Sequence, residues 1–180
     1  MEFETERLIL RPVEDRDAVF LFPLINDKEV ADNMLNVPFP YPEKELGTWI
    51  AVCREAMEKC ERFEFAVHLK EIGSPIGVCS LLHIDWRARS TELAYWLGKK
   101  YWRQGYMTEA VKILIDNTYE KFGLDYIFGC CFSHNVASAR VMRKAGLKYV
   151  SHTREAVQKG NQHLDAIYFE IDLIQHAARK

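Results

Sequence analysis

The sequence has no run of 18 apolar residues and no strong excess of charge of one sign. A membrane-spanning helix needs about 20 consecutive apolar residues, so no membrane partner is expected. Two of the first four residues are acidic and the N-terminus lacks the apolar stretch of a signal peptide, which predicts a cytoplasmic protein. The net charge of -2 argues against a general nucleic-acid binder, because such domains are usually basic.

Cysteine is scarce and is not arranged in pairs. There are five cysteines, an odd number, and none forms a CxxC motif. Neither a disulfide framework nor a zinc site is therefore expected, and no other metal is predicted. Cys79 and Cys130 lie in apolar runs, which predicts that both thiols are buried.

The composition that remains is that of a globular domain. Hydrophobic residues make up 48% of the chain and charged residues 28%. A chain of 180 residues is long enough to build a core without disulfides, so residues 1–180 are expected to form one domain. The aromatic side chains Phe20, Phe22 and Trp49, on two expected N-terminal helices, are predicted to lie in that core.

Hydrophobic periodicity predicts the element order βααβββαβαββ. Hairpins and helical crossovers both occur in this order, so the sheet must be mixed and the fold is of the α/β (α+β) type. The expected strands cover residues 7–11, 63–69, 76–84, 91–97, 126–132, 148–157 and 163–173. The expected helices cover residues 15–25, 43–59, 108–122 and 135–145.

One segment combines a strand, a short turn and the start of a helix. Residues 92–97 are followed by a turn that contains Gly105, and a helix begins near Thr108. Such a helix N-terminus directs backbone N–H groups and a positive dipole end at one point, where a phosphate fits. The pattern is neither a P-loop nor a dinucleotide-binding fingerprint, and by itself it suits an ordinary structural connector equally well.

A second strand–turn–helix segment follows at residues 131–147. The two segments together resemble a known family. The chain resembles the GNAT superfamily of acyl-CoA N-acyltransferases, and within it the RimJ/RimL-like branch of ribosomal-protein N-terminal acetyltransferases. The resemblance runs in order over nearly the whole chain. The matching pieces are residues 5–12 (TERLILRP), 92–97 (ELAYWL), 101–110 (YWRQGYMTEA), 135–138 (NVAS) and 144–147 (KAGL), with Asp165 and Tyr168 on the last strand.

The resemblance implies a mostly antiparallel sheet of about seven strands flanked by about four helices. This sheet would splay where acetyl-CoA binds, between the strands ending at Leu97 and Phe132. The pantetheine arm would pair with the backbone of Tyr95, Trp96 and Leu97. Asn135 would hydrogen-bond the same arm. The pyrophosphate would lie on the amides of Arg103, Gln104, Gly105, Tyr106, Met107 and Thr108.

The chain departs from the superfamily pattern at two positions. Met107 stands where glycine or alanine is usual; a methionine directed into the core would leave its amide free for phosphate. Met142 stands where many members have a tyrosine that acts as general acid. Ser138 is the remaining polar group, and it can donate a hydrogen bond to the sulfur. A thiol with a pKa of about 8.5 is a fair leaving group and needs no strong acid.

A general base must remove a proton from the attacking amine, and acidic residues near this turn are the candidates. Glu92, at the start of the strand that leads to the cofactor turn, is the first candidate and can act through water. Its alternative is a solvated carboxylate at a strand end. Glu155 is the second candidate, although the best-aligned position, Val157, is two residues further on and expected on the same strand face. His134 lies beside the cofactor turn, but a turn residue is its favoured interpretation, and His83 is expected to be structural.

The implied reaction is transfer of an acetyl group to a primary amine, by direct attack in a ternary complex. The acceptor is a protein N-terminus or a small-molecule amine, with Phe39 and Tyr41 as candidates for a mobile wall of its site. A non-catalytic acyl-CoA-binding or partner-binding module on the same fold is the alternative that Met107 and Met142 leave open. The protein is expected to be a monomer or a homodimer.

Overall fold

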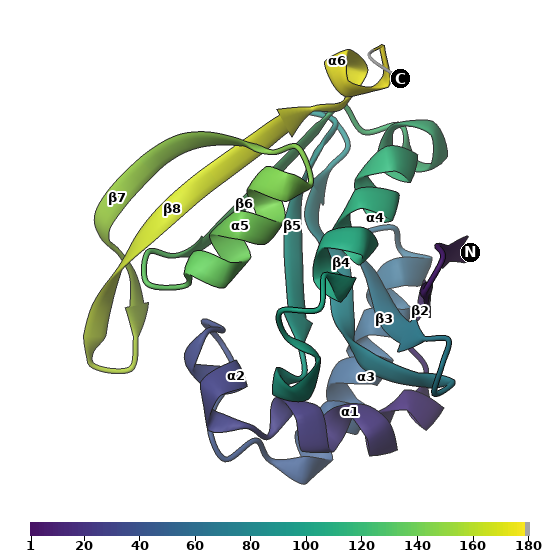
Figure 1. Ribbon diagram of the computed structural model, residues 1–180, viewed down its shortest axis with the longest axis vertical. Helices are drawn as coiled ribbons and strands as arrows, with labels where there is room; N and C mark the ends of the chain where they lie inside the picture. Colours follow the sequence, from purple (N-terminus) through teal and green to yellow (C-terminus); the bar gives the residue numbers. More distant parts are fainter. Residues whose placement is uncertain (179–180) are drawn as a thin grey trace.

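The computed structural model describes residues 1–178, which contain one eight-stranded mixed sheet with the strand order β1-β2-β3-β4-β5-β6-β8-β7 (Figure 1). The strands are β1 (Phe3–Glu4), β2 (Leu8–Pro12), β3 (Phe63–Leu69), β4 (Ser74–Asp85), β5 (Ser90–Leu97), β6 (Tyr126–Phe132), β7 (Lys148–Lys159) and β8 (Gln162–Asp172). The helices are α1 (Ala18–Ile25), α2 (Lys28–Asp32), α3 (Glu43–Glu58), α4 (Tyr106–Phe122), α5 (Val136–Lys144) and α6 (Leu173–Ala177), with 3-10 turns η1 (Asp15–Asp17) and η2 (Lys99–Tyr101).

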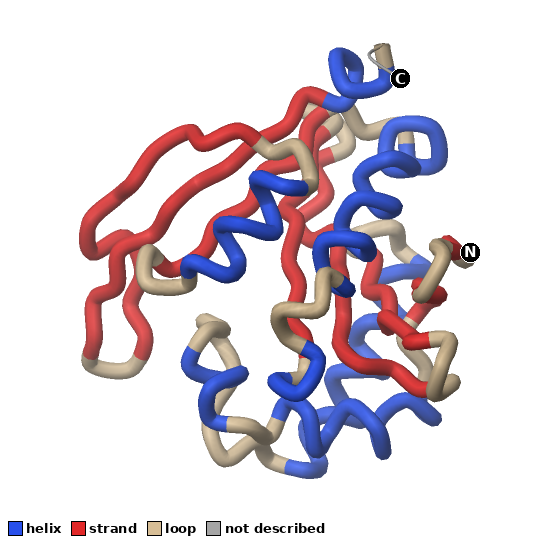
Figure 2. The backbone as a smooth tube through the Cα atoms, in the orientation of Figure 1, coloured by secondary structure: helices blue, strands red, loops and turns tan. Residues whose placement is uncertain are grey.

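The sheet splays at its only parallel pair of strands among the described residues, β5 and β6. Their pairing covers Ser90 to Glu92 on β5 and Tyr126 to Phe128 on β6, and it stops there. Beyond this point the two strands diverge, as the smooth backbone trace also shows (Figure 2). Residues 93–97 and 129–132 therefore face a split, and the predicted splayed sheet is confirmed.

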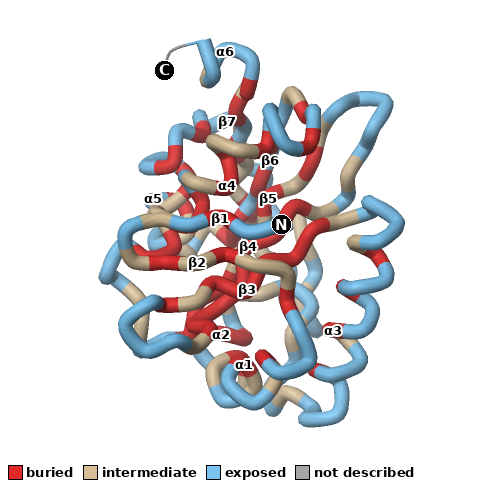
Figure 3. The backbone as a smooth tube through the Cα atoms, turned by 90° about the vertical axis from the view of Figure 1, so that its right-hand side faces the viewer, coloured by how far each residue is buried: buried red, intermediate tan, exposed pale blue. Residues whose placement is uncertain are grey.

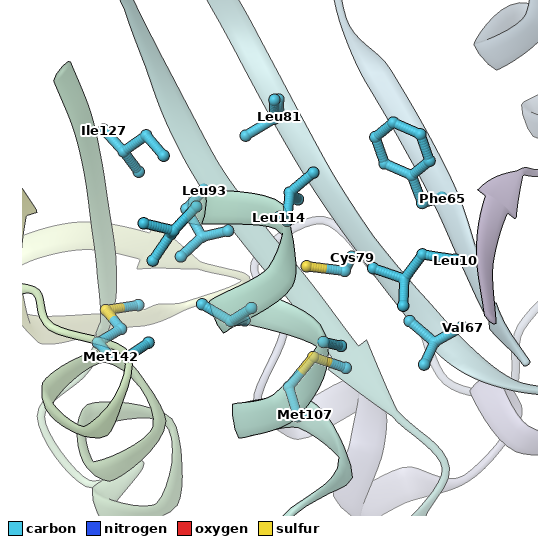
Figure 4. Packing of buried hydrophobic residues seen from close by; sticks show 14 of the residues in the cluster. Leu10, Phe65, Val67, Cys79, Leu81, Leu93, Met107, Leu114, Ile127 and Met142 are labelled. Atoms are coloured by element: carbon cyan, nitrogen blue, oxygen red, sulfur yellow. The ribbon is translucent and has the colours of Figure 1, made fainter. Parts of the chain in front are cut away.

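Helices cover the sheet on both faces. Buried residues of α4 and α5 form one hydrophobic cluster with β2, β3, β4 and β5, in which Leu114, Leu93 and Met142 pack together (Figure 4). On the opposite face, α1 and α3 pack on Ala66, Val78 and Trp96. The central strands are thus buried between two layers of helices whose outer surfaces are exposed (Figure 3).

Strand β6 is covered on one face only. Its residues alternate between exposed and buried from Tyr126 to Cys131. Cys130 is consequently exposed and its neighbour Cys131 is buried, so the prediction that Cys130 is a buried thiol was wrong; for Cys79 it is confirmed. Sequence hydrophobicity around Cys130 is high, but the helices α1 and α3 end before they reach this strand.

The predicted order of the main elements is confirmed, and the bounds of β3 and β6 match the predicted ones. Strand β1 and helices α2 and α6 were not predicted, because each is at most five residues long. The N-terminal helix is shorter than predicted. In α1, Leu21 and Ile25 are buried while Phe20 is 47% exposed, so the prediction of a core position for Phe20 was wrong. Phe22 and Trp49 do pack against the core as expected.

No helix within residues 1–178 is long and apolar enough to cross a membrane.

Candidate active site

The turn between β5 and α4, residues 98–105, has an unusual backbone. Arg103 has φ = 62° and Gly105, the N-cap of α4, has φ = 84°. Both values lie in the left-handed region, which glycine adopts without strain and other residues rarely adopt. A side chain at Gly105 would also place its Cβ 3.4 Å from Nη2 of Arg7. The glycine is therefore favoured here by its backbone conformation, while the contact with Arg7 is an ordinary one.

This turn leaves a series of backbone N–H groups available. Within residues 1–178, no protein acceptor is found for the amides of residues 103–108, and the first amide that returns to the turn is that of Glu109, which donates to Gly105 O at 3.0 Å. Unpaired amides at the start of a 17-residue helix carry the positive end of its dipole. Such a group of donors binds phosphate or pyrophosphate.

Arg7, in the bend between β1 and β2, fixes the shape of this turn. Its Nε donates to Oε2 of Glu109 at 2.7 Å, and its Nη1 donates to the carbonyl oxygen of Gln104 at 3.0 Å. The guanidinium also lies 4.5 Å from the centre of the Tyr106 ring. Burial raises the pKa of the Glu109 carboxyl, but hydrogen bonds from Thr5 and Arg7 outweigh this and hold it below its usual range. Arg7 and Glu109 thus brace the first turn of α4.

A cavity of about 440 Å³ opens beside these amides. Its lining includes Gly105 and Thr108 together with Lys112 on α4 and Lys144 on α5. Sequence reasoning singled out neither lysine as a candidate for binding. For Lys112 a signal existed, since it lies four residues after Thr108 and so on the same face of the helix; for Lys144 only the packing of α5 beside α4 brings the side chain here.

Both methionines that depart from the family pattern lie in the core. Met107 is 6% exposed and Met142 is 1% exposed, and their side chains point into the hydrophobic cluster around α4 (Figure 4). The bulk of Met107 is therefore directed away from the amides of the turn. Met142 packs against Gly129, where an added Cβ would be 3.4 Å from its terminal carbon.

The turn between β6 and α5, residues 133–135, carries the second set of predicted residues. The Asn135 side chain accepts from the Ser138 amide at 3.0 Å and thereby caps α5. Its oxygen is used in this way, and its NH₂ group is left as the donor that could serve a ligand. The Tyr95 hydroxyl lies 3.0 Å from both the Ser138 hydroxyl and the Ser138 carbonyl oxygen.

The remaining predicted groups lie along β5 and in the turn. Trp96 is 8% exposed and faces α1 and α3. The Leu97 carbonyl oxygen accepts from Nε1 of Trp102 at 2.7 Å, so this backbone acceptor is already used. The first strand of the split thus offers backbone from residues 93–97 on the side that β6 leaves open.

Glu92 lies at the position where the parallel pairing ends. Its side chain is 26% exposed, and its Oε2 is 3.6 Å from Nε2 of His83. Paired residues of parallel strands share a face, so Glu92 and Phe128 lie together on the face opposite α4 and α5. Cys130 is exposed as a residue, but partial desolvation of its thiol raises the pKa of that group to about 11, and the Glu92 charge adds to this increase. His83, expected to be structural, is thus the ionisable neighbour of Glu92.

The second candidate base lies further out. Glu155 is exposed, and its amide donates to Asp165 at 3.0 Å. It has φ = 50°, and the pairing of β7 with β8 shifts register between Thr153 and Val157. This irregularity interrupts the strict alternation on which the expected common face of Glu155 and Val157 depends. His134 stacks on Phe132 with ring centres 5.4 Å apart, in the β6–α5 turn.

Two further observations bear on the site. Within residues 1–178, no group of three or more His, Cys, Asp or Glu side chains is arranged to hold a metal ion. The proline loop places Phe39 at the surface, 50% exposed, while Tyr41 packs against the core near α1 and α3.

Comparison with known proteins connects this geometry to a family. The family model described as an acetyltransferase (GNAT) domain matches residues 7–148. The uncharacterized N-acetyltransferase p20 of Bacillus licheniformis is 26% identical over 93% of both chains. The ribosomal-protein-S5-alanine acetyltransferase of Vibrio fischeri has a TM-score of 0.85 at 20% identity, covering 96% of each chain. The ribosomal L7/L12 alpha-N-protein acetyltransferase RimL, solved with Coenzyme A, has a TM-score of 0.86 at 16% identity, covering 96% of this chain and 98% of its own.

The family match spans most of the chain, including β5, the unpaired amides that follow it, β6 and all of α5. The splayed strands and the turn with its unpaired amides therefore both lie within the matched acetyltransferase domain. This chain belongs to the GNAT acetyltransferase family and is an acetyl-CoA-dependent acyltransferase.

Proposed function

We propose that residues 1–180 form one acetyltransferase domain that transfers the acetyl group of acetyl-CoA to a primary amine by direct attack in a ternary complex. The observation that carries this proposal is the juxtaposition of unpaired amides 103–108 with the split between β5 and β6. The amides would bind the pyrophosphate, Lys112 and Lys144 would add positive charge, and residues 95–97 would pair with the pantetheine arm. The NH₂ group of Asn135 would donate to the same arm.

Two side chains would assist the transfer. Glu92 would accept the proton that the attacking amine loses, directly or through water, while the new C–N bond forms. As the C–S bond breaks, the Ser138 hydroxyl would donate a hydrogen bond to the leaving sulfur. The N-terminal end of α5 would favour the developing thiolate further. Glu155 remains the second candidate for the base.

The acceptor is proposed as an amine that reaches Glu92 from the face opposite α4 and α5. The fold neighbours from V. fischeri and RimL are by name ribosomal-protein acetyltransferases. Another fold neighbour is a spermidine N-acetyltransferase chimera. A protein N-terminus of the RimJ/RimL type is therefore proposed first and a small-molecule amine second.

The test is release of CoA from acetyl-CoA with a panel of amines that includes N-terminal peptides and polyamines. Sustained release that depends on an amine supports the enzyme. Tight CoA binding without turnover on any amine would instead support the non-catalytic module, the alternative raised by Met107 and by methionine in place of tyrosine at position 142.

The role of Glu92 is tested with Glu92→Gln, and Glu155→Gln serves as the matched comparison. We expect Glu92→Gln to lower turnover and change its pH profile while CoA affinity stays the same. The same loss in Glu155→Gln, with normal turnover across pH in Glu92→Gln, would transfer the role of base to Glu155.

A further inference from the structure

A tyrosine hydroxyl lies beside Ser138, although the usual tyrosine position on α5 is taken by Met142. The hydroxyl belongs to Tyr95 of β5, 43 residues away in the sequence. It lies 3.0 Å from the Ser138 hydroxyl and 3.0 Å from the Ser138 carbonyl oxygen. The two strands of the split are thus connected, through α5, by a side-chain hydrogen bond at the point where the thioester is expected.

The surroundings of this pair are fixed. The Ser138 amide is held by Asn135 at 3.0 Å, which sets the first turn of α5. The Tyr95 ring packs against the core cluster beneath α4 and α5. Burial raises the pKa of the Cys131 thiol, and a hydrogen bond with Ser138 opposes this, so the serine hydroxyl already has a sulfur atom as a neighbour.

We propose that Tyr95 is a positioning residue that orients the Ser138 hydroxyl toward the leaving sulfur of acetyl-CoA. This inference rests on the proposed role of Ser138. A free serine hydroxyl rotates among three staggered positions and also competes for the nearby carbonyl oxygens. The Tyr95 hydroxyl restricts this freedom, because it donates to the Ser138 carbonyl oxygen and lies 3.0 Å from the Ser138 hydroxyl. It thereby occupies that carbonyl acceptor and one side of the serine hydroxyl, and leaves the serine proton for sulfur.

Tyr95 would act without giving up its proton. Burial raises the pKa of its hydroxyl well above its usual value, and the hydrogen bond to Ser138 only partly opposes the increase. A buried tyrosinate is therefore strongly disfavoured. The arrangement differs from that of a general acid: no proton passes to sulfur from Tyr95, and the thiolate leaves stabilised by the serine O–H.

The test is a double-mutant cycle with Tyr95→Phe, Ser138→Ala and the double variant, measured with an amine that supports turnover. Loss of a hydrogen bond to a charged sulfur should lower kcat about tenfold or more in Ser138→Ala. Tyr95→Phe keeps the ring and should lower kcat about three- to tenfold. The double variant should match Ser138→Ala within about twofold, because Tyr95 acts through Ser138. KM for acetyl-CoA and the Kd of CoA should be unchanged in all three.

Thr118→Val is the structural control. Thr118 is fully buried on α4, and its hydroxyl donates to the Leu114 carbonyl oxygen at 2.7 Å. Its loss should lower the Tm as Tyr95→Phe does and leave kcat normal. This separates loss of a buried hydroxyl from loss of orientation at Ser138.

Each of the other possible results of the double-mutant cycle contradicts one part of the proposal. Normal kcat in Ser138→Ala removes both the proposed role of Ser138 and that of Tyr95. A loss in Ser138→Ala with normal kcat in Tyr95→Phe overturns the role of Tyr95 alone. Losses that multiply in the double variant show that Tyr95 acts independently of Ser138, and a raised Kd for CoA in Tyr95→Phe shows that it holds α5 as a whole.

Discussion

The two strand–turn–helix units on either side of the split differ in how they treat the free backbone amides at the start of the helix. In the β6–α5 turn, the protein supplies its own cap, because Asn135 accepts from the Ser138 amide. In the β5–α4 turn, the N-cap is Gly105, which has no side chain, and the amides of residues 103–108 have no acceptor within residues 1–178. A similar local pattern therefore fixes the position of a serine in one unit and leaves backbone amides without an acceptor in the other.

The difference follows from which groups fill each turn. An Asx side chain satisfies an orphan amide of the first helical turn, so a capped helix has fewer donors left for a ligand. A left-handed glycine leaves all of them open. The uncapped α4 is instead stabilised from the side, where Arg7 bonds Glu109 and the Gln104 carbonyl oxygen.

The largest expected loss of CoA affinity comes from the substitution Gly105→Val. A β-branched residue at φ = 84° is strained by about 1–3 kcal/mol, and the turn must rearrange. We expect CoA affinity, measured by calorimetry, to fall about tenfold to hundredfold.

Gly123→Val is the matched control at the other end of α4. Gly123 has φ = 67° and no atom within 4 Å of an added Cβ, so its strain is similar but remote from the amides. Equal losses of CoA affinity in the two variants would show that the effect is on helix stability and would remove the anion-binding role of the turn.

A smaller loss of CoA affinity is expected from Arg7→Met. This substitution keeps an aliphatic side chain and removes the hydrogen bonds to Glu109 and to the turn. The Arg7 side chain is 40% exposed, so the loss is limited to about 1 kcal/mol, or about fivefold in CoA affinity. Arg54→Met, which breaks an exposed ion pair with Asp15 at 3.1 Å, should leave CoA affinity unchanged. An equal loss of CoA affinity in both variants would contradict a specific role of Arg7 in stabilising the turn.

The same brace predicts a pH dependence. The pKa of Glu109 is lowered in the folded protein, so its contribution to the free energy of unfolding is complete above the usual value of 4.5. The contribution is lost as the pH falls through the lower folded pKa. The acid part of the unfolding curve should therefore differ between Glu109→Gln and the parent protein, and identical curves would contradict the brace.

The smallest effect on ligand binding is expected from Asn135→Ala. Loss of the cap should lower the free energy of unfolding by about 1 kcal/mol, measured by denaturant titration. Asn135→Asp keeps a capping oxygen and should restore stability. If CoA affinity falls in the aspartate variant as well, the NH₂ group contacts the ligand; if it is normal in both, Asn135 is only a helix cap.

Much of the site could be predicted because its signals are local. Asn135 follows a strand and caps the next helix, as predicted. Gly105 likewise lies between a strand and a helix, where the sequence places it, and its approach to a ligand stays a prediction. The position of Phe20 could not be predicted in this way, since α1 is short and its buried stripe is set by contact with β4. The partner of Glu92 was missed for a similar reason, because His83 reaches it only through an irregular β4–β5 hairpin.

The sequence by itself determined the order of the main elements, the place of the glycine-containing turn before α4, the capped helix α5 and the family resemblance. All of these depend on residues within a few positions of one another. Only the tertiary structure decided which distant groups meet: Arg7 with Glu109, Lys144 beside Lys112, and Tyr95 with Ser138. Such contacts depend on how helices pack across the splayed sheet, and periodicity along one element carries no information about its neighbour across the split.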